Sequence, residues 1–295
     1  MIIMNITFIF VLLAPIAYGL VNIIDEYYCS KKIKSPFSYT AVVGIAHVIL
    51  GLLIASFLDW KGFTLSMLPI PIILGVLYAA MLLIYYFALY KEDVSSIVGI
   101  DYSYPIIVAI LSFFILHENI GIIGYLALLL IILGVFNLQK RMAKIRLDMS
   151  LWVLILMPIV TGTYEFIIKI STINIPEFNA LAINSFVAGV IVISTLSMKK
   201  VRKDFPEDIK NIWLALANES LTIISILFIF LAMKYYPATI VASIGTLQIL
   251  FVLIIEQMFL VKIDGITKDK ILMPKLSGIL LIVSGVILMT IVGII

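Results

Sequence analysis

The sequence predicts an all-α integral membrane protein whose ten transmembrane helices form two related five-helix halves. Of its 295 residues, 63% are hydrophobic and 13% are charged, and the mean hydropathy is +1.22. A water-soluble protein of this length would expose apolar patches far larger than monomers tolerate. The apolar residues also come in long runs separated by short polar segments, which is the pattern that membrane-spanning helices produce.

Apolar runs of about 20 residues, the length that crosses the hydrocarbon core of a bilayer, mark the ten predicted spans. They lie at 3–24, 38–58, 68–90, 93–116, 120–139, 151–171, 178–198, 211–235, 238–260 and 275–295. A basic linker at 140–150 separates five spans from five, so we divide the chain into 1–139, 140–150 and 151–295. Lys91 to Asp93 joins the third and fourth spans in a tight hairpin, and 199–210 is one of the remaining polar loops.

Composition excludes several classes of protein. The net charge is +3 and the basic residues lie in loops without interleaved aromatics, so we expect no nucleic-acid partner. Cys29 is the one cysteine, which rules out an internal disulfide and a cysteine-based metal cluster. We predict no metal site and no cofactor, and the chain has no GxxxxGK[ST] loop for ATP. The apolar run near Met1 lacks a basic start and a cleavage pattern, so we interpret it as a first helix and not a signal peptide.

The two halves look like the product of a duplication. Pro15 opens a pattern in the first span that recurs at Pro158 in the sixth, 143 residues further on. The segment 87–98 between the third and fourth spans resembles 231–241, at an offset of 144. The last span of each half carries a Gly-Val pair, at Gly134 and Gly285. Repeats in the same order at a nearly constant offset predict two structurally equivalent halves.

Short sequences in the first half follow one another in a characteristic order. They are Ala-Leu-Tyr at 88–90, Val-Ser-Ser at 94–96, Tyr104-Pro105, Leu-His-Glu-Asn at 116–119 and Leu-Gly-Val at 133–135. This series resembles the signature of EamA-type members of the drug/metabolite transporter superfamily. The second half fits less well, because Ile249 stands in the place of Pro105 and Lys262 in the place of Glu118. The resemblance implies ten helices, an inverted second repeat and a substrate cavity between the halves.

The sixth predicted span carries Thr161, Glu165 and Lys169 on one helix face. An ionisable side chain near the bilayer centre costs at least about 2.5–3.5 kcal/mol, so each requires a reason. One interpretation places this face on a cavity wall, where Glu165 meets a cation or a proton and Lys169 meets an anionic group such as a carboxylate. The other is that Glu165 and Lys169 neutralise each other.

Asp101 lies in the fourth predicted span, one helical turn before Pro105. Pro105 has no N–H to bond the carbonyl of Asp101, so we expect a kink with a free backbone oxygen. An acid and Tyr104 beside such a kink are typical of substrate sites near the bilayer midplane. The alternative is an Asp101 that packs the kink and binds nothing.

Four further residues complete the predicted substrate or ion site. They are Asn22, Tyr78, Tyr85 and Glu219, each of which could equally serve ordinary helix packing.

Three other polar residues are expected to have structural roles. We expect His47 to form an interhelical hydrogen bond in preference to relaying protons. Glu118 should cap a helix end or hold a loop, and Glu256 should reach the membrane interface.

The interior charges favour a transporter of cationic or zwitterionic molecules. Asp101, Glu165 and Glu219 are opposed by one deep base, Lys169. We therefore predict a secondary active permease of the plasma membrane for a small polar metabolite, namely an amino acid, an amine or a cationic compound, with proton coupling an open option. Its partners are the lipid bilayer and a small molecule, and a monomer and a homodimer are both open. The alternatives are a membrane enzyme acting on lipid, or a structural or sensory subunit.

Two arguments about orientation disagree. All of the 20 Lys and Arg residues except Lys61, Lys169 and Lys234 fall on one side of the predicted spans. The positive-inside rule then places both termini outside the cytoplasm. The family resemblance implies both termini inside, and we favour the charge rule because every loop is short.

Overall fold

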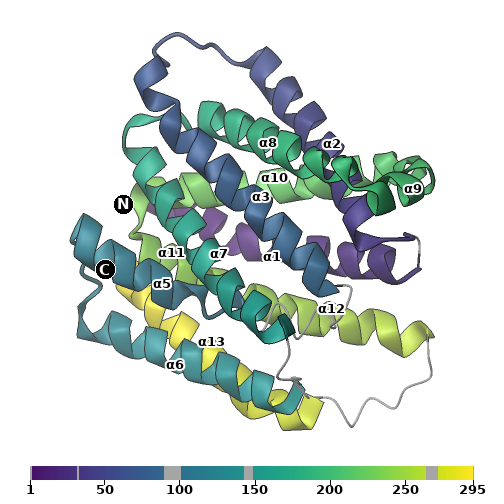
Figure 1. Cartoon of the computed structure of the whole chain (residues 1–295). Helices are drawn as coiled ribbons and strands as arrows, with labels where there is room; N and C mark the ends of the chain where they lie inside the picture. Colours follow the sequence, from purple (N-terminus) through teal and green to yellow (C-terminus); the bar gives the residue numbers. More distant parts are fainter. Residues whose placement is uncertain (1, 32, 90–100, 143–148, 264–271, 295) are drawn as a thin grey trace.

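The chain folds into a bundle of long helices (Figure 1). The computed structural model describes residues 2–31, 33–89, 101–142, 149–263 and 272–294, and within these ranges it holds helices and no strand. The helices of the first half are α1 (Ile2–Lys31), α2 (Pro36–Phe57), α3 (Pro69–Leu89), α5 (Tyr104–Leu111) and α6 (Gly121–Met142). Those of the second half are α7 (Met149–Asn174), α8 (Glu177–Ile193), α9 (Lys199–Asp208), α10 (Ile212–Tyr235), α11 (Ala238–Gly245), α12 (Gln248–Ile263) and α13 (Leu272–Ile294). Single turns occur at η1 (Leu65–Met67), η2 (Ser112–Leu116), η3 (Ser194–Ser197) and η4 (Ile209–Asn211).

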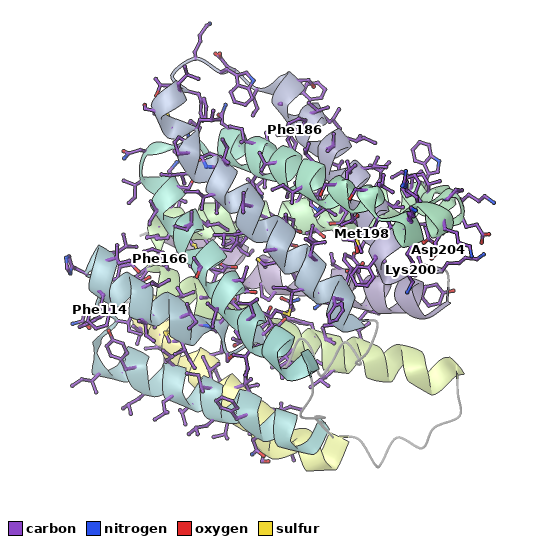
Figure 2. All side chains as sticks on the ribbon, in the orientation of Figure 1. Phe114, Phe166, Phe186, Met198, Lys200 and Asp204 are labelled. Carbon is purple, nitrogen blue, oxygen red and sulfur yellow. The ribbon has the colours of Figure 1, made fainter. Side chains whose placement is uncertain are left out.

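The outer surface of this bundle is apolar, as a bilayer requires. Within the described ranges, eight helical segments are long and apolar enough to cross a membrane. Two shorter apolar helices, Tyr104–Leu116 and Gly121–Asn137, fall where the fourth and fifth spans are predicted. Large hydrophobic side chains face outward, among them Phe114 at 70% exposure and Phe186 at 40% (Figure 2). The protein is therefore a multi-pass α-helical membrane protein, and the number of ten spans stays a prediction.

Helices of the two halves pair in a reciprocal way. The second helices of the halves, α2 and α8, pack together, and so do the last ones, α6 and α13, which lie side by side in Figure 1. The first helix of each half packs on the third helix of the other, α1 on α10 and α7 on α3. Likewise α1 contacts α12 and α7 contacts α5. An exchange of this kind is what a two-fold relation between the halves would give, and the inversion of the second repeat stays a prediction.

Glycines permit the closest of these helix pairs. A Cβ at Gly189 of α8 would lie 2.5 Å from the carbonyl oxygen of Gly44 on α2. A Cβ at Gly134 of α6 would lie 2.8 Å from the carbonyl oxygen of Gly278, and one at Gly285 of α13 would lie 2.7 Å from that of Ala127. Small residues bring backbones together in this way when two helices associate in a membrane.

A turn lies at an equivalent place in each half, before α5 in the first and before α12 in the second. In the first half a turn at Tyr102 and Ser103 precedes α5, so Pro105 stands in the opening turn of a helix and not in its middle. Proline suits that position, because the first turn needs no donor from its nitrogen. In the second half a turn at Thr246 and Leu247, 144 residues after the first turn, separates α11 from α12. The second turn was not expected from the sequence, since no proline accompanies it.

Two of the expected boundaries differ from the structure. The predicted polar loop 199–210 contains the helix α9, which carries Lys200 and Asp204 at the end of the bundle opposite the N and C marks (Figures 1 and 2). This helix is held to the start of α2, because the backbone N–H of Lys34 donates to Oδ1 of the buried Asp208 at 2.9 Å. The ammonium of Lys34 also donates to Glu207 at 2.7 Å, and this bond raises the pKa of Lys34.

The first predicted span also ends too early. It stops at residue 24, whereas α1 continues to Lys31. Some sequence predictions fall outside the described residues: the hairpin at Lys91 to Asp93, the Val-Ser-Ser sequence at 94–96 and most of the linker 140–150. The side chains of Glu256 and Lys262 are likewise not described.

Candidate functional site

A cavity of about 130 Å³ lies inside the bundle. Side chains from α1, α3 and α5 line it together with side chains from α7, α10 and α11, so both halves contribute to its wall. Gln248 at the start of α12 and Asp101, just before the turn that leads into α5, complete the lining. The position of the cavity agrees with the one that the family resemblance implies.

The lining is acidic and aromatic. Its carboxyl groups belong to Asp25, Asp101, Glu165 and Glu219. Its phenol rings belong to Tyr18, Tyr78, Tyr85, Tyr86, Tyr102, Tyr104 and Tyr164. No lysine, arginine or histidine is among the described side chains that line it. Because charges interact strongly in a low dielectric, four acids without a lining base give the cavity a negative potential whenever the carboxyl groups are ionised.

Glu165 is the acid whose oxygen is left open to a ligand. It is 6% exposed, and its Oε2 has no hydrogen-bond partner among the described residues. One turn earlier on α7, Thr161 donates its hydroxyl to Oδ1 of Asp101 at 2.7 Å. The helical spacing of 161 and 165 thus puts an unpaired acid next to a hydrogen-bonded one. Both interpretations of this face give Glu165 a partner, and its Oε2 has none among the described residues.

Tyr104 of α5 joins α11 across the cavity wall. Its hydroxyl donates to the carbonyl oxygen of Ala242 at 3.0 Å. That carbonyl is available because the backbone N–H of Thr246 bonds to Ser243 instead, at 3.3 Å. A Cβ at Gly245 would lie 2.6 Å from the same tyrosine oxygen, so a glycine is needed there. The turn between α11 and α12 is therefore accompanied by a hydrogen bond from a side chain of the first half.

A second acidic group gathers on α1 and α10. Asp25, 3% exposed, accepts hydrogen bonds from the hydroxyl of Tyr86 and from Nδ2 of Asn218, both at 2.9 Å. Next to it, the hydroxyl of Tyr85 donates to Oδ1 of Asn22 at 3.4 Å. Asp25 was missed in the sequence because the first span was ended at residue 24. Its spacing of three residues from Asn22 puts both side chains on one helix face, and this spacing could have assigned Asp25 to the site.

Glu219 of α10 contacts a histidine behind the cavity wall. Nε2 of His47 lies 2.9 Å from Oε2 of Glu219, within ion-pair distance although the atoms are poorly aligned for a hydrogen bond. The imidazole ring is completely buried and packs edge-on against Tyr78, with the ring centroids 5.2 Å apart. The expected interhelical role of His47 thus has a specific partner, an acid on the cavity wall.

Lys169 does not reach the cavity. Its ammonium donates to the carbonyl oxygens of Met233 at 2.7 Å and Tyr236 at 2.9 Å, and lies 3.4 Å from Oε1 of Glu118. Carbonyls at a helix C-terminus lack intrahelical partners, so α10 offers Lys169 a ready acceptor site. Glu118 also accepts the backbone N–H of Ala238 at 2.9 Å, which caps the start of α11 as expected. The acidic partner that the structure gives to Lys169 is thus Glu118 and not Glu165.

The other predicted site residues do line the cavity. They are Asn22, Tyr78, Tyr85, Asp101, Tyr104, Thr161, Glu165 and Glu219. The residues that sequence reasoning did not assign to the site include Tyr18, Asp25, Tyr86 and Tyr164. Tyr18 shares a face of α1 with Asn22 at a spacing of four, which is a helical signal. Tyr164 directly precedes Glu165, and nothing in its spacing distinguishes it from a packing residue.

Comparison with known proteins gives a shared fold for the whole chain and a family resemblance for its first half. No curated protein matches the chain. Among 28 matching solved chains, one whose title says only that it is the crystal structure of a protein superposes with a TM-score of 0.70. At 14% identity over 98% of both chains, this similarity concerns the fold. Residues 5–138 match the family model described as the EamA-like transporter family. The first half of this chain thus resembles the EamA-like transporter family, a match that supports a transporter of the membrane.

Proposed function

We propose that this protein is a secondary active transporter of the plasma membrane that carries small organic cations, amines foremost. The observation behind the proposal is the lining of the cavity, which has four carboxyl groups, seven tyrosines and no described basic side chain. A cation over a tyrosine face gains about 0.5 kcal/mol at exposed sites and about 2 kcal/mol when desolvated. Acids and phenol rings together are therefore the chemistry that attracts an ammonium group.

Glu165 and Asp101 are the proposed anchors of that ammonium group. Glu165 has the open oxygen, and Thr161 fixes Asp101 beside it. A buried carboxylate without a partner is costly, so a ligand cation that replaces water gains from meeting it. Tyr104 and Tyr164 supply ring faces on the same wall.

The placement of Lys169 narrows the substrate class. An amino acid would need a cationic partner for its carboxylate, and the sequence offered Lys169 for that role. In the structure Lys169 is held by two carbonyl oxygens and Glu118 outside the cavity lining. Amines and quaternary cations, which bring no carboxylate, fit the remaining lining better than zwitterions do.

Ligand binding to the purified protein tests this proposal. We expect benzyltrimethylammonium to bind by calorimetry at least about tenfold more tightly than its uncharged isostere neopentylbenzene, a difference of about 1.4 kcal/mol. The variants Glu165→Gln and Asp101→Asn should each weaken binding by about tenfold or more, because each removes a charge and little volume. In liposomes the same variants should slow uptake of the labelled cation.

A matched control separates charge in the cavity from charge elsewhere. Glu207→Gln makes the same chemical change on α9, where the side chain is 54% exposed and pairs with Lys34. It should leave the affinity for benzyltrimethylammonium unchanged. Equal binding of the charged and the uncharged ligand, or full affinity in both cavity variants, would refute the proposed substrate class.

A further inference from the structure

The group formed by Asp25, His47 and Glu219 is not explained by cation binding alone. These residues come from α1, α2 and α10, whereas the proposed ammonium anchors come from α7 and from the segment before α5. Unlike Glu165, the acids in this group already have partners: Asp25 has Tyr86 and Asn218, and Glu219 has the imidazole. A second set of ionisable groups therefore adjoins the same cavity, with Asp25 and Glu219 in its lining and His47 behind Glu219.

We propose that Asp25, His47 and Glu219 form a proton-binding site, and that a cation entering the cavity displaces one proton from it. The inference rests on the proposed function, since it names the ion that is exchanged for the organic cation. Charge balances in the step: one positive charge enters with the cation and one leaves with the proton. The exchange of a monovalent cation is therefore electroneutral.

The geometry around His47 suits a proton and little else. The ring is fully buried, its Nε2 lies 2.9 Å from Glu219, and its Nδ1 has no hydrogen-bond partner in the part of the chain that the structure describes. Tyr78 covers the ring, so no larger ligand has room there. Imidazole nitrogens and carboxylate oxygens both accept protons, so a proton can be held between Nε2 and Oε2 at this distance.

Glu219 is the member that lines the cavity and also contacts the histidine, which lies behind the cavity wall. The ionisable groups around it are, by helix, Tyr18 and Asp25 on α1, His47 on α2, Tyr78 on α3, and Tyr164 and Glu165 on α7. The sequence of α11 has no ionisable residue, and that of α8 has only Glu177, which pairs with Lys234 at 2.6 Å. Glu219 therefore connects the cavity to the buried imidazole, and a cation in the cavity would repel a proton held between the two side chains.

Proton release on ligand binding tests the inference. Purified protein in weak buffer is mixed with benzyltrimethylammonium, whose quaternary charge cannot itself release a proton, and a pH-indicator dye reports the result. We expect about one proton per bound cation near pH 7, and a dissociation constant that rises by up to about tenfold for each unit by which the pH falls. In Glu219→Gln the number of protons released per bound cation should drop at least about fivefold.

His47→Gln is a second variant that does not touch the cavity lining. Above the pH at which the site has lost its proton, the affinity of this variant should lie within about twofold of the wild type, because Glu165 and Asp101 are intact. Its pH dependence of proton release should nevertheless shift by more than about half a pH unit. If His47 had a purely structural role, its replacement would not shift the pH dependence of proton release while leaving the affinity for the cation unchanged. Glu207→Gln serves again as the control with unchanged release.

The possible failures are distinguishable. If the wild type does not bind benzyltrimethylammonium, the proposed function fails and this inference fails with it. If the cation binds without proton release, or if both Glu219→Gln and His47→Gln release protons as the wild type does, the proton site is refuted and the cation transporter stands.

Discussion

Lys169 shows that a residue on the polar face of a helix can still lie beyond the end of the cavity. Lys169 lies two turns beyond Thr161 on the same helix face, but its side chain reaches the end of α10 and not the cavity. It joins the end of α10 to α7 and, through Glu118, to the start of α11. A periodic pattern predicts which face of a helix is polar. It does not predict how far along the helix a cavity extends, and for this reason the sequence placed Lys169 in the wrong surroundings.

Replacing Lys169 should weaken the fold and spare the ligand. Lys169→Met leaves the carbonyls of Met233 and Tyr236 without their donor, and an unsatisfied buried group costs about 1–3 kcal/mol. Thermal unfolding in detergent should show a lowered midpoint, while the affinity for benzyltrimethylammonium stays the same.

Lys234→Met is the matched control for this change. The side chain of Lys234 is 46% exposed in its pair with Glu177, and exposed pairs contribute little. We expect almost no change in the midpoint. An unchanged midpoint of thermal unfolding in Lys169→Met, together with a large loss of affinity for benzyltrimethylammonium, would instead indicate that Lys169 acts in the cavity.

At the scale of one residue, the sequence predicted cavity residues well where a charged side chain occurs in an otherwise apolar span. Asp101, Glu165 and Glu219 stand out in apolar spans because burial of an acid is expensive, and all three line the cavity. Tyrosines do not stand out in this way, since they pack in any helix. Asp25 was lost through the boundary of a single span, which shows how much a site prediction depends on where a helix is taken to end.

At the scale of elements, contact between helices depends on residues without side chains. The crossing of α2 and α8 brings Gly44 and Gly189 together, with no room for a Cβ between them. The sequence could not predict this contact, because a glycine pattern does not name its partner helix. It did predict the equivalence of Gly134 and Gly285, which meet the partner helix in reciprocal positions.

A bulky residue at this crossing should separate the helices. Gly189→Leu places several atoms where the backbone of α2 lies, and overpacking costs about 1–3 kcal/mol or more. We expect a lowered unfolding temperature and a smaller monodisperse fraction in size-exclusion chromatography. Val190→Leu, one residue further and 48% exposed, adds volume towards lipid and should change neither. Similar stability of the two variants would contradict the packing described for α2 and α8.

At the scale of the whole molecule, composition and run length were enough to predict a helical membrane protein. They could not give the pairing of α1 with α10 and of α7 with α3, because such contacts depend on three-dimensional shape complementarity. The end of the bundle that carries α9 lies opposite both termini (Figure 1). The basic residues of α9 therefore bear directly on the orientation in the membrane.

Labelling from outside the cell decides this orientation. In a Cys29→Ser background, Lys61→Cys and Lys203→Cys mark opposite ends of the predicted bundle. The positive-inside rule predicts that an impermeant maleimide labels the cysteine at 61 in intact cells, and labels the one at 203 only after the membrane is opened. The reverse result would favour the orientation that the family resemblance implies.

The bond from Tyr104 to Ala242 crosses from one half of the chain to the other. A piece that ends before the basic linker would keep the donor of this bond and lose its acceptor, and the remaining piece would keep the acceptor without the donor. Severing the linker should therefore leave each fragment with an unmet hydrogen-bonding group until the two fragments reassociate.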